Sequence, residues 1–292
     1  MGFDRFAVMN SMVDSGGRGL EIGPSHAPIF PKSKGYNVDV LDYASADDLR
    51  AKYAGGTVNV EAIEHVDYVS DGRPIHEIIT DRECYDFIIS SHVIEHVTDF
   101  VSYFKSCEAL LKPDGVAVLA IPDKRFTFDV MQQLTSTGDV LEAHRNKASR
   151  HSPSRVFDFI SNFASMGGLD TWNASHRGLT VLPNDLKSAK SWFDLASNDA
   201  GYIDIHGWRF TPSSFRLIMQ DLNELGLCGL REMHLVEDGD FEFLASLSRK
   251  GAGSNLTRLE LLHAIQLETA VGVLQGLAPH STWAAEALRQ HS

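Results

Sequence analysis

The chain has 292 residues, 43% of them hydrophobic, with a formal net charge of −13. These values describe an ordinary globular protein with enough sequence for one large or two modest domains, and the acidic balance argues against a nucleic-acid partner, which needs clustered Lys and Arg. The three cysteines are scattered without a C-x-x-C pair, which disfavours a disulfide framework or structural zinc. With neither a stretch of about 18 apolar residues nor a basic-then-apolar leader, we expect no membrane span and a cytoplasmic location.

The first informative stretch is LEIGPSH, residues 20–26. Residues 18–23 are typical of a short buried strand that ends in a glycine turn, and residues 36–42 predict a second strand ending in Asp42. Asp42 lies 19 positions after Gly23. At the carboxyl edge of a parallel sheet, such a glycine lets the backbone approach a ligand, and an acid about 20 residues later accepts ribose hydroxyls. The pair therefore predicts a nucleoside site.

The loop chemistry distinguishes between two nucleoside cofactors. A dinucleotide needs G-x-G-x-x-G and a helix whose amino end faces the pyrophosphate. No glycine follows Gly23 until Gly35, and Pro24, Pro28 and Pro31 leave little room for a helix. Since S-adenosylmethionine carries no phosphate, the loop favours this cofactor over NAD.

Further along the chain, we expect a helix over 46–53 capped by Ser45, a strand over 63–69 and an Asp71-Gly72 turn. A strand over 85–90 leads into HVIEH, residues 92–96, and a helix over 100–111 precedes a strand over 116–121. The pattern H-x-x-E-H also occurs in zinc proteases, where it lies inside a helix. Here it follows a strand directly, so we disfavour a protease and predict no metal.

These stretches resemble class I S-adenosylmethionine-dependent methyltransferases, above all in YDFIISSHVIEHV, residues 85–97, and LLKPDG, residues 110–115. The resemblance implies that Asp42 holds the ribose and that an acid after the third strand, Asp71, meets the adenine, although Asp-Gly is also a good turn dipeptide. It places the methionine end near residues 90–92. The full set of expected cofactor-binding residues is Glu21, Gly23, Pro24, Ser25, Asp42, Tyr43, Asp71, Gly72, Ser90, Ser91 and His92.

Residues 127–204 are too long for a strand-helix connection, so we expect a helical insertion over the active site, with helices over 130–134, 138–147, 154–164 and 182–196. Residues 202–210 then alternate so that Asp204 and His206 share one face of an extended segment. An acid beside a histidine orients the ring as a general base requires, and it equally suits a structural pair. His206 is our candidate base, oriented by Asp204, with His92 and His144 as reserves.

The chain then continues with a helix over 213–225 that begins at Thr211-Pro212, and with a hairpin of residues 230–236 and 241–248. After a hinge at 250–254, residues 256–277 predict an appended helix that packs on its own domain or on a second subunit as a homodimer.

The fold prediction is a Rossmann-like, seven-stranded, mostly parallel α/β sheet with a helical cap and a C-terminal helical extension. Its domains are 1–126 with 205–250, then 127–204, then 251–292. The segments IPDKRF and DIHGWRFTP resemble methyltransferases that accompany bacterial surface-polysaccharide synthesis. That resemblance implies O-methylation of a sugar hydroxyl of a glycan or glycolipid precursor. The alternatives are a small-metabolite O-methyltransferase, a catalytically silent binding module and an NAD-dependent oxidoreductase.

Overall fold

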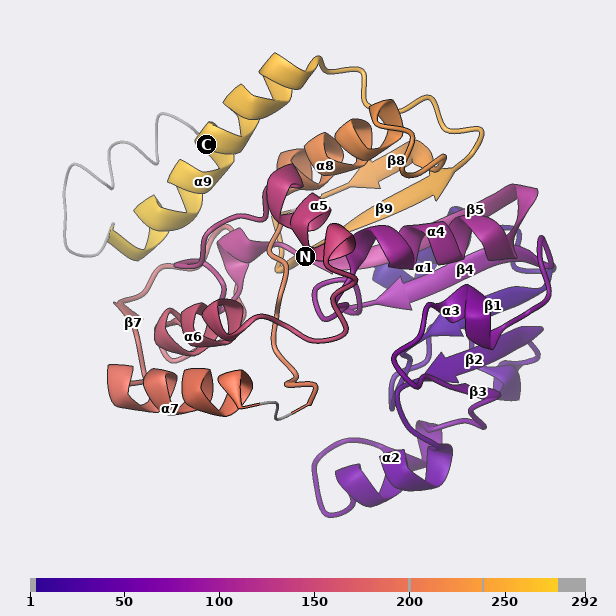
Figure 1. Ribbon diagram of the computed structural model, residues 1–292, viewed down its shortest axis with the longest axis horizontal. Helices are drawn as coiled ribbons and strands as arrows, with labels where there is room; N and C mark the ends of the chain where they lie inside the picture. Colours follow the sequence, from indigo (N-terminus) through magenta and orange to yellow (C-terminus); the bar gives the residue numbers. More distant parts are fainter. Residues whose placement is uncertain (1–3, 199–200, 238, 278–292) are drawn as a thin grey trace.

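A seven-stranded sheet forms the centre of the computed structural model, which describes residues 4–198, 201–237 and 239–277 (Figure 1). Its strands lie in the order β3-β2-β1-β4-β5-β9-β8. Their bounds are β1 Gly19–Ile22, β2 Val38–Asp42, β3 Tyr68–Val69, β4 Tyr85–Ser91, β5 Leu111–Pro122, β8 Arg231–Val236 and β9 Glu242–Ser248.

Most of this sheet is parallel. β1 pairs in parallel with β2 and β4, and β5 pairs in parallel with β4. β9 runs antiparallel to both β5 and β8, so the predicted closing hairpin is confirmed. The predicted seven-stranded, mostly parallel sheet is therefore confirmed, and the carboxyl ends of β1, β2, β4 and β5 meet at one edge.

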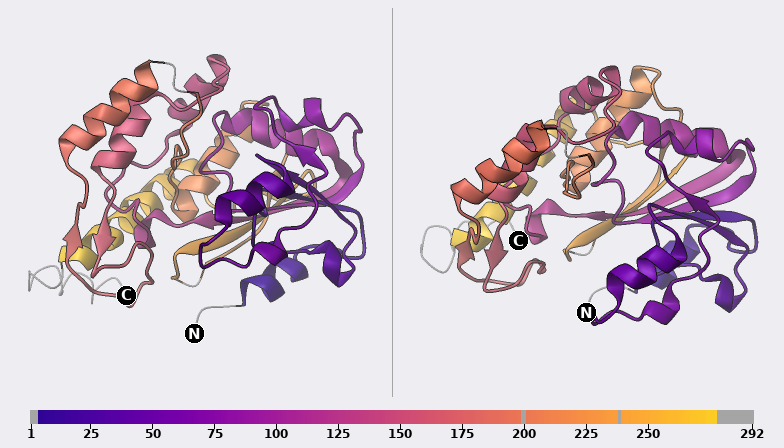
Figure 2. Two further views of the ribbon diagram at one scale, coloured as in Figure 1. Left: turned by 90° about the horizontal axis from the view of Figure 1, so that it is seen from below. Right: turned by 60° about the horizontal axis from the view of Figure 1, so that its bottom comes forward.

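Helices cover both faces of the sheet (Figures 1 and 2). One face and its helices form the largest hydrophobic cluster, to which α3 (Ile75–Ile78), α4 (Phe100–Leu110), α5 (Thr137–Arg145) and α8 (Pro212–Glu224) contribute. On the other face, α1 (Arg5–Ser11) buries Met9 among side chains of β4, β5 and β9. α2 (Ala46–Tyr53) packs Leu49 against Val40 of β2. The sheet is thus the middle of three layers.

Capping hydrogen bonds fix the predicted starts of α2 and α8. The Ser45 hydroxyl accepts a hydrogen bond from the Asp48 amide at 3.2 Å and begins α2, as predicted. α8 begins at Thr211-Pro212, where the Ser214 hydroxyl lies 2.8 Å from the Thr211 amide nitrogen that donates to it. Both helices therefore follow from short sequence signals.

Two predicted elements are wrong. The third strand was expected over 63–69, but it spans Tyr68–Val69, and residues 60–62 form a 3-10 turn. The Asp67 carboxylate accepts the Val40 amide at 2.7 Å, so a side chain replaces a backbone partner of β2 there. Residues 130–134 form turns in place of the predicted helix.

The segment between β5 and α8 divides between two locations. α5 packs on α4 and α8, over the face of the sheet. α6 (Pro153–Ser161) and α7 (Leu186–Ser197) pack on each other and lie on the side toward which the arrowheads of β2 and β4 point (Figure 1). A small sheet of β6 (Ser165–Met166) and β7 (Thr180–Val181) accompanies them. The boundaries of the predicted cap at 127–204 stay a prediction.

The C-terminal helix α9 (Arg258–Leu277) packs on α8 of its own chain. Glu268 accepts from the Ser213 hydroxyl at 2.6 Å, and Arg258 donates to Asp221 at 2.9 Å. Leu259 and Leu267 remain exposed, and a homodimer through this helix stays a prediction. The end of the predicted extension, 278–292, lies outside the described residues. Within the described residues, no helix combines the length and apolarity needed to cross a membrane.

Candidate functional site

The loop after β1 is shaped by strained backbone and by one buried acid. Gly23 has φ +67°, and a Cβ there would lie 2.8 Å from the Val93 side chain, so glycine is needed on both counts. Ser25 is a non-glycine residue with φ +47°. The buried Glu21 carboxylate accepts from the amides of Ile29 at 2.6 Å and Phe30 at 3.1 Å. Glu21 therefore ties down the far end of the loop that contains Pro24 and Ser25.

Asp42 joins this loop to the end of β2. Its carboxylate is 1% exposed and accepts from the amides of Ser25 at 2.8 Å and Tyr43 at 2.7 Å. Burial raises the pKa of Asp42, although the two amides oppose that effect. Each carboxylate oxygen has lone pairs beyond these bonds, so the group can also accept hydrogen bonds from a pair of vicinal hydroxyls.

The turn after β3 is more open. The Asp71 carboxylate accepts from the Arg73 amide at 3.1 Å and pairs with the Arg73 guanidinium, which lowers the pKa of Asp71. Gly72 has φ +88°. Tyr43 is 54% exposed, and its hydroxyl accepts from Lys52 at 2.7 Å. These groups follow β2 and β3, which are neighbours in the sheet.

The end of β4 carries the other predicted cofactor residues. Ser90 accepts a hydrogen bond from the buried Tyr103 hydroxyl at 2.9 Å. Ser91 accepts from Arg5 of α1. His92 has φ +54°, a conformation that costs about 1 to 3 kcal/mol in a non-glycine residue and that concentrates at functional sites. Its Nε2 lies 2.9 Å from Glu242.

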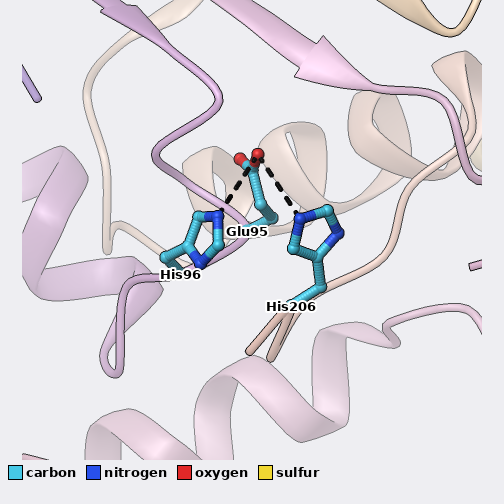
Figure 3. Close-up of side chains that lie close together, drawn as sticks. All are labelled: Glu95, His96 and His206. Atoms are coloured by element: carbon cyan, nitrogen blue, oxygen red, sulfur yellow. Dashed lines mark ion pairs between the residues drawn. The ribbon is translucent and has the colours of Figure 1, made fainter. Parts of the chain in front are cut away.

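Beyond His92, the side chains of Glu95, His96 and His206 lie close together and point toward one another (Figure 3). Glu95 is 1% exposed, and neither of its carboxylate oxygens has a hydrogen-bond partner within the described residues. Its Oε1 lies 3.8 Å from Nε2 of His96 and 4.0 Å from Nε2 of His206. His92 Nδ1 approaches the same oxygen at 3.5 Å. A buried carboxylate is thus surrounded by three imidazoles.

Each of these imidazoles has a second carboxylate on its other nitrogen, and this corrects one prediction. Asp204 was expected to orient His206, but its Oδ1 lies 2.8 Å from Nδ1 of His96. The carboxylate on Nδ1 of His206 is Asp129, at 2.5 Å. Residues 202–209 form no strand, so the period-two alternation that was expected to align Asp204 with His206 does not apply.

The charges in the cluster influence each other strongly. Burial raises the pKa of Glu95, but His92, His206 and His96 more than offset this effect and lower it below its ordinary value. Burial lowers the pKa of His92, but Glu242 and Glu95 outweigh it and raise the pKa to about 9. Asp204 and Glu95 likewise raise the pKa of His96 against its burial. The raised pKa values of His92 and His96 and the lowered pKa of Glu95 therefore favour charged imidazoles around an ionised carboxylate.

The remaining predicted residue, His144, lies elsewhere. Its Nδ1 pairs with Asp99 at 2.9 Å, and its Nε2 lies 3.4 Å from Lys105. Asp99 caps α4 and Lys105 lies on the same helix, so these contacts fix α5 against α4. The motif H-x-x-E-H itself forms a turn and not a helix, which agrees with the context argument against a zinc protease.

Sequence reasoning missed Arg5, Asp129 and Arg209, three polar residues near this edge. Arg5 of α1 donates to Ser91 and pairs with Glu242, and no motif in the sequence distinguishes it. Asp129 lies just before the residues that were expected to form a helix, and no motif distinguishes it. Arg209 is 8% exposed, and two of its guanidinium nitrogens have no hydrogen-bond partner within the described residues. Only Arg209, inside DIHGWRFTP, carried a signal in the sequence.

Comparisons with known proteins agree with this geometry. A family model described as a methyltransferase domain matches residues 5–223. A ubiquinone biosynthesis O-methyltransferase of Rhodopseudomonas palustris is 46% identical over 44 residues, which is 15% of this chain and 17% of that enzyme. The chain therefore matches only a small part of that relative.

Among solved structures, an S-adenosylmethionine-dependent methyltransferase from Mesorhizobium loti has 15% identity and a TM-score of 0.44, covering 84% of this chain and 98% of that one. A Rhodobacter sphaeroides structure titled as a zinc-dependent alcohol dehydrogenase has 15% identity and a TM-score of 0.47, covering 86% and 92%. Likenesses of this size carry no argument about activity.

The family assignment rests on the match over most of the chain, together with the strand order and the glycine loop and acid at the ends of β1 and β2. The family match favours a methyltransferase over the NAD-dependent oxidoreductase. The chain belongs to the methyltransferase domain family.

Proposed function

We propose that this methyltransferase transfers the methyl group to a sugar hydroxyl of a glycan or glycolipid precursor. The observation that carries the O-methylation is the polar cluster beside the predicted methionine end, where the Glu95, His96 and His206 side chains converge (Figure 3). A hydroxyl acceptor must lose its proton, and these groups provide the chemistry to remove it.

For the cofactor, we propose that the ribose hydroxyls donate to Asp42, that the loop at Gly23–Ser25 lies against the nucleoside, and that the adenine reaches Asp71. Ser90–His92 then take the methionine end. The strand order supports this placement, because the carboxyl ends of β2, β1 and β4 lie next to one another in the sheet. Arg5, which bonds Ser91, is positioned to pair with the cofactor carboxylate.

The reaction breaks the sulfur–methyl bond and forms an oxygen–methyl bond, and the hydroxyl proton leaves the acceptor. Since the sulfonium already activates the methyl group, the protein must align the acceptor oxygen, exclude water and remove that proton. His206, which bonds Asp129 and lies 9% exposed in its side chain, is the residue we assign to the acceptor proton.

The choice of a sugar draws support from Arg209 and from the resemblance of DIHGWRFTP. A buried guanidinium with donors not used by the described residues suits an acceptor rich in oxygen atoms. Its charge interacts with Asp129, the partner of His206, so it lies near the acceptor group.

A phenolic small metabolite is the second candidate. The Phe128 ring lies 4.7 Å from the His206 ring, and the Phe159 ring lies 6.0 Å from it, which gives an aromatic wall beside the acceptor site. The 44-residue match to ubiquinone biosynthesis O-methyltransferases points in the same direction.

The test is a screen of labelled methyl transfer from S-adenosylmethionine onto saccharides, phenols and peptides. The proposal expects labelled saccharide whose label resists the mild base that cleaves methyl esters. Transfer to phenols alone would favour the second candidate, and transfer to peptides alone would contradict both. On the true acceptor, His206→Ala should lower the rate about 10²- to 10⁴-fold, while His234→Ala on exposed β8 serves as the matched control.

A further inference from the structure

The buried Glu95 carboxylate accepts no hydrogen bond from the described residues. It is 1% exposed, and the ring nitrogens around its Oε1 are Nδ1 of His92 at 3.5 Å, Nε2 of His96 at 3.8 Å and Nε2 of His206 at 4.0 Å. The distances to His96 and His206 are too long for direct hydrogen bonds. A buried carboxylate is stabilised by positive charge close to it, which His92 supplies from one side and which the side facing His96 and His206 leaves room for.

The outer carboxylates determine which ring nitrogens are available. Asp129 accepts from Nδ1 of His206 at 2.5 Å, and Asp204 lies 2.8 Å from Nδ1 of His96. A neutral imidazole whose Nδ1 carries the proton toward a carboxylate has a free lone pair on Nε2. Both Nε2 atoms point toward Glu95 (Figure 3). Such carboxylate–histidine pairs are the usual outer contacts of histidines that bind metal ions.

From this arrangement we infer that Glu95, His96 and His206 bind one divalent first-row transition-metal ion. Their ligand atoms all lie within 4.8 Å of one another. Ligand atoms about 2.1 Å from one ion are about 3.0 to 3.4 Å apart, so small side-chain rotations close the set. Two imidazoles and one carboxylate favour zinc, cobalt, iron or nickel over magnesium and calcium, which prefer all-oxygen sites.

The site also has an entry path and open positions. The His96 side chain is 31% exposed and the Asp204 side chain 66%, so one side of the cluster reaches solvent, while Glu95 lies within. Three protein ligands leave coordination positions for an acceptor oxygen.

The ion's role in catalysis rests on the proposed methyl transfer, whereas its binding does not. An acceptor hydroxyl on the ion has a lowered pKa and releases its proton to water. The oxygen then takes the methyl group as the sulfur–carbon bond breaks, which leaves S-adenosylhomocysteine and a methyl ether. In this scheme the role assigned above to His206, removal of the acceptor proton, passes to the ion that His206 helps to bind.

The test uses the full chain, stripped with EDTA and titrated with Co²⁺ while its visible absorption is followed. We expect one equivalent to bind, with the intense bands of a low-symmetry site, and Zn²⁺ to displace it. Glu95→Gln, which keeps the side-chain shape, should weaken Co²⁺ binding at least 100-fold, and Asp129→Asn, an outer partner, about 10- to 100-fold. The exposed His234→Ala variant should bind as wild type.

Three results separate this inference from the proposed function. If Co²⁺ binds with the same affinity to wild type and Glu95→Gln, the inferred site is wrong, whatever the acceptor. If the EDTA-stripped enzyme keeps its full methyl-transfer rate without added metal, the ion's catalytic role is wrong. If Co²⁺ binds as expected but no hydroxyl compound is methylated, the site stands and the proposed acceptor class fails. Glu95→Gln should still bind S-adenosylhomocysteine within about threefold of wild type, which confirms that the variant is folded.

Discussion

Replacing Asp42 by Ala tests the cofactor site where its geometry is most specific. In the proposed complex, both ribose hydroxyls donate to a carboxylate that is 1% exposed and fixed by the amides of Ser25 and Tyr43. A hydrogen bond to a charged group contributes about 1.5 to 3 kcal/mol, so two of them contribute about 3 to 6 kcal/mol before compensation. Even the lower figure corresponds to about 150-fold in affinity.

The assay is calorimetric titration with S-adenosylhomocysteine. Asp42→Ala should weaken binding at least 100-fold, and Asp42→Asn, which keeps one acceptor oxygen, should lie between that variant and wild type. Asp47→Asn is the matched control, because its side chain is 97% exposed on α2. Thermal unfolding without ligand shows whether each variant is folded. Binding by a folded Asp42→Ala variant within threefold of wild type would refute the placement of the ribose.

Three further predictions concern the frame of the site. Burial raises the pKa of Glu21 to about 7, although the amides of the following loop oppose it. Because the folded chain holds this proton more tightly than the unfolded chain, ionisation between about pH 4.5 and 7 should lower the free energy of unfolding by up to about 3 kcal/mol, and urea unfolding of Glu21→Gln should lack that decline. Gly23→Ala would place its Cβ 2.8 Å from Val93 at φ +67°, so it should weaken S-adenosylhomocysteine binding at least tenfold; unchanged binding would show that the loop readily adapts. Glu268→Ala removes the acceptor for Ser213 and should lower stability by about 1 to 2 kcal/mol, and an unchanged melting temperature would show that apolar contacts alone hold α9.

The sheet could be predicted from sequence because its signals are local. Strand ends at Gly23 and Asp42, the Ser45 cap and the Thr211-Pro212 helix start each need only a few neighbouring residues. The third strand is shorter than predicted. The Asp67 side chain accepts the hydrogen bond of the Val40 amide there, and the apolar pattern of the sequence does not reveal this contact.

The acceptor site was only half predictable for the same reason. The sequence named His92 and His206 as candidates. Glu95 and His96 lie in the same motif as His92, but they were not among the predicted site residues. The partners of those residues come from distant positions: Asp129 is 77 residues from His206, and Glu242 is 150 residues from His92. The expected Asp204–His206 pair assumed a strand where none forms, and only the folded chain reveals that Asp204 belongs to His96.

The most direct test of the whole account is a crystal structure of the chain with S-adenosylhomocysteine. The account predicts the ribose on Asp42 and the homocysteine sulfur directed at the group formed by Glu95, His96 and His206. A ligand bound elsewhere, or one whose sulfur faces away from that group, would contradict it.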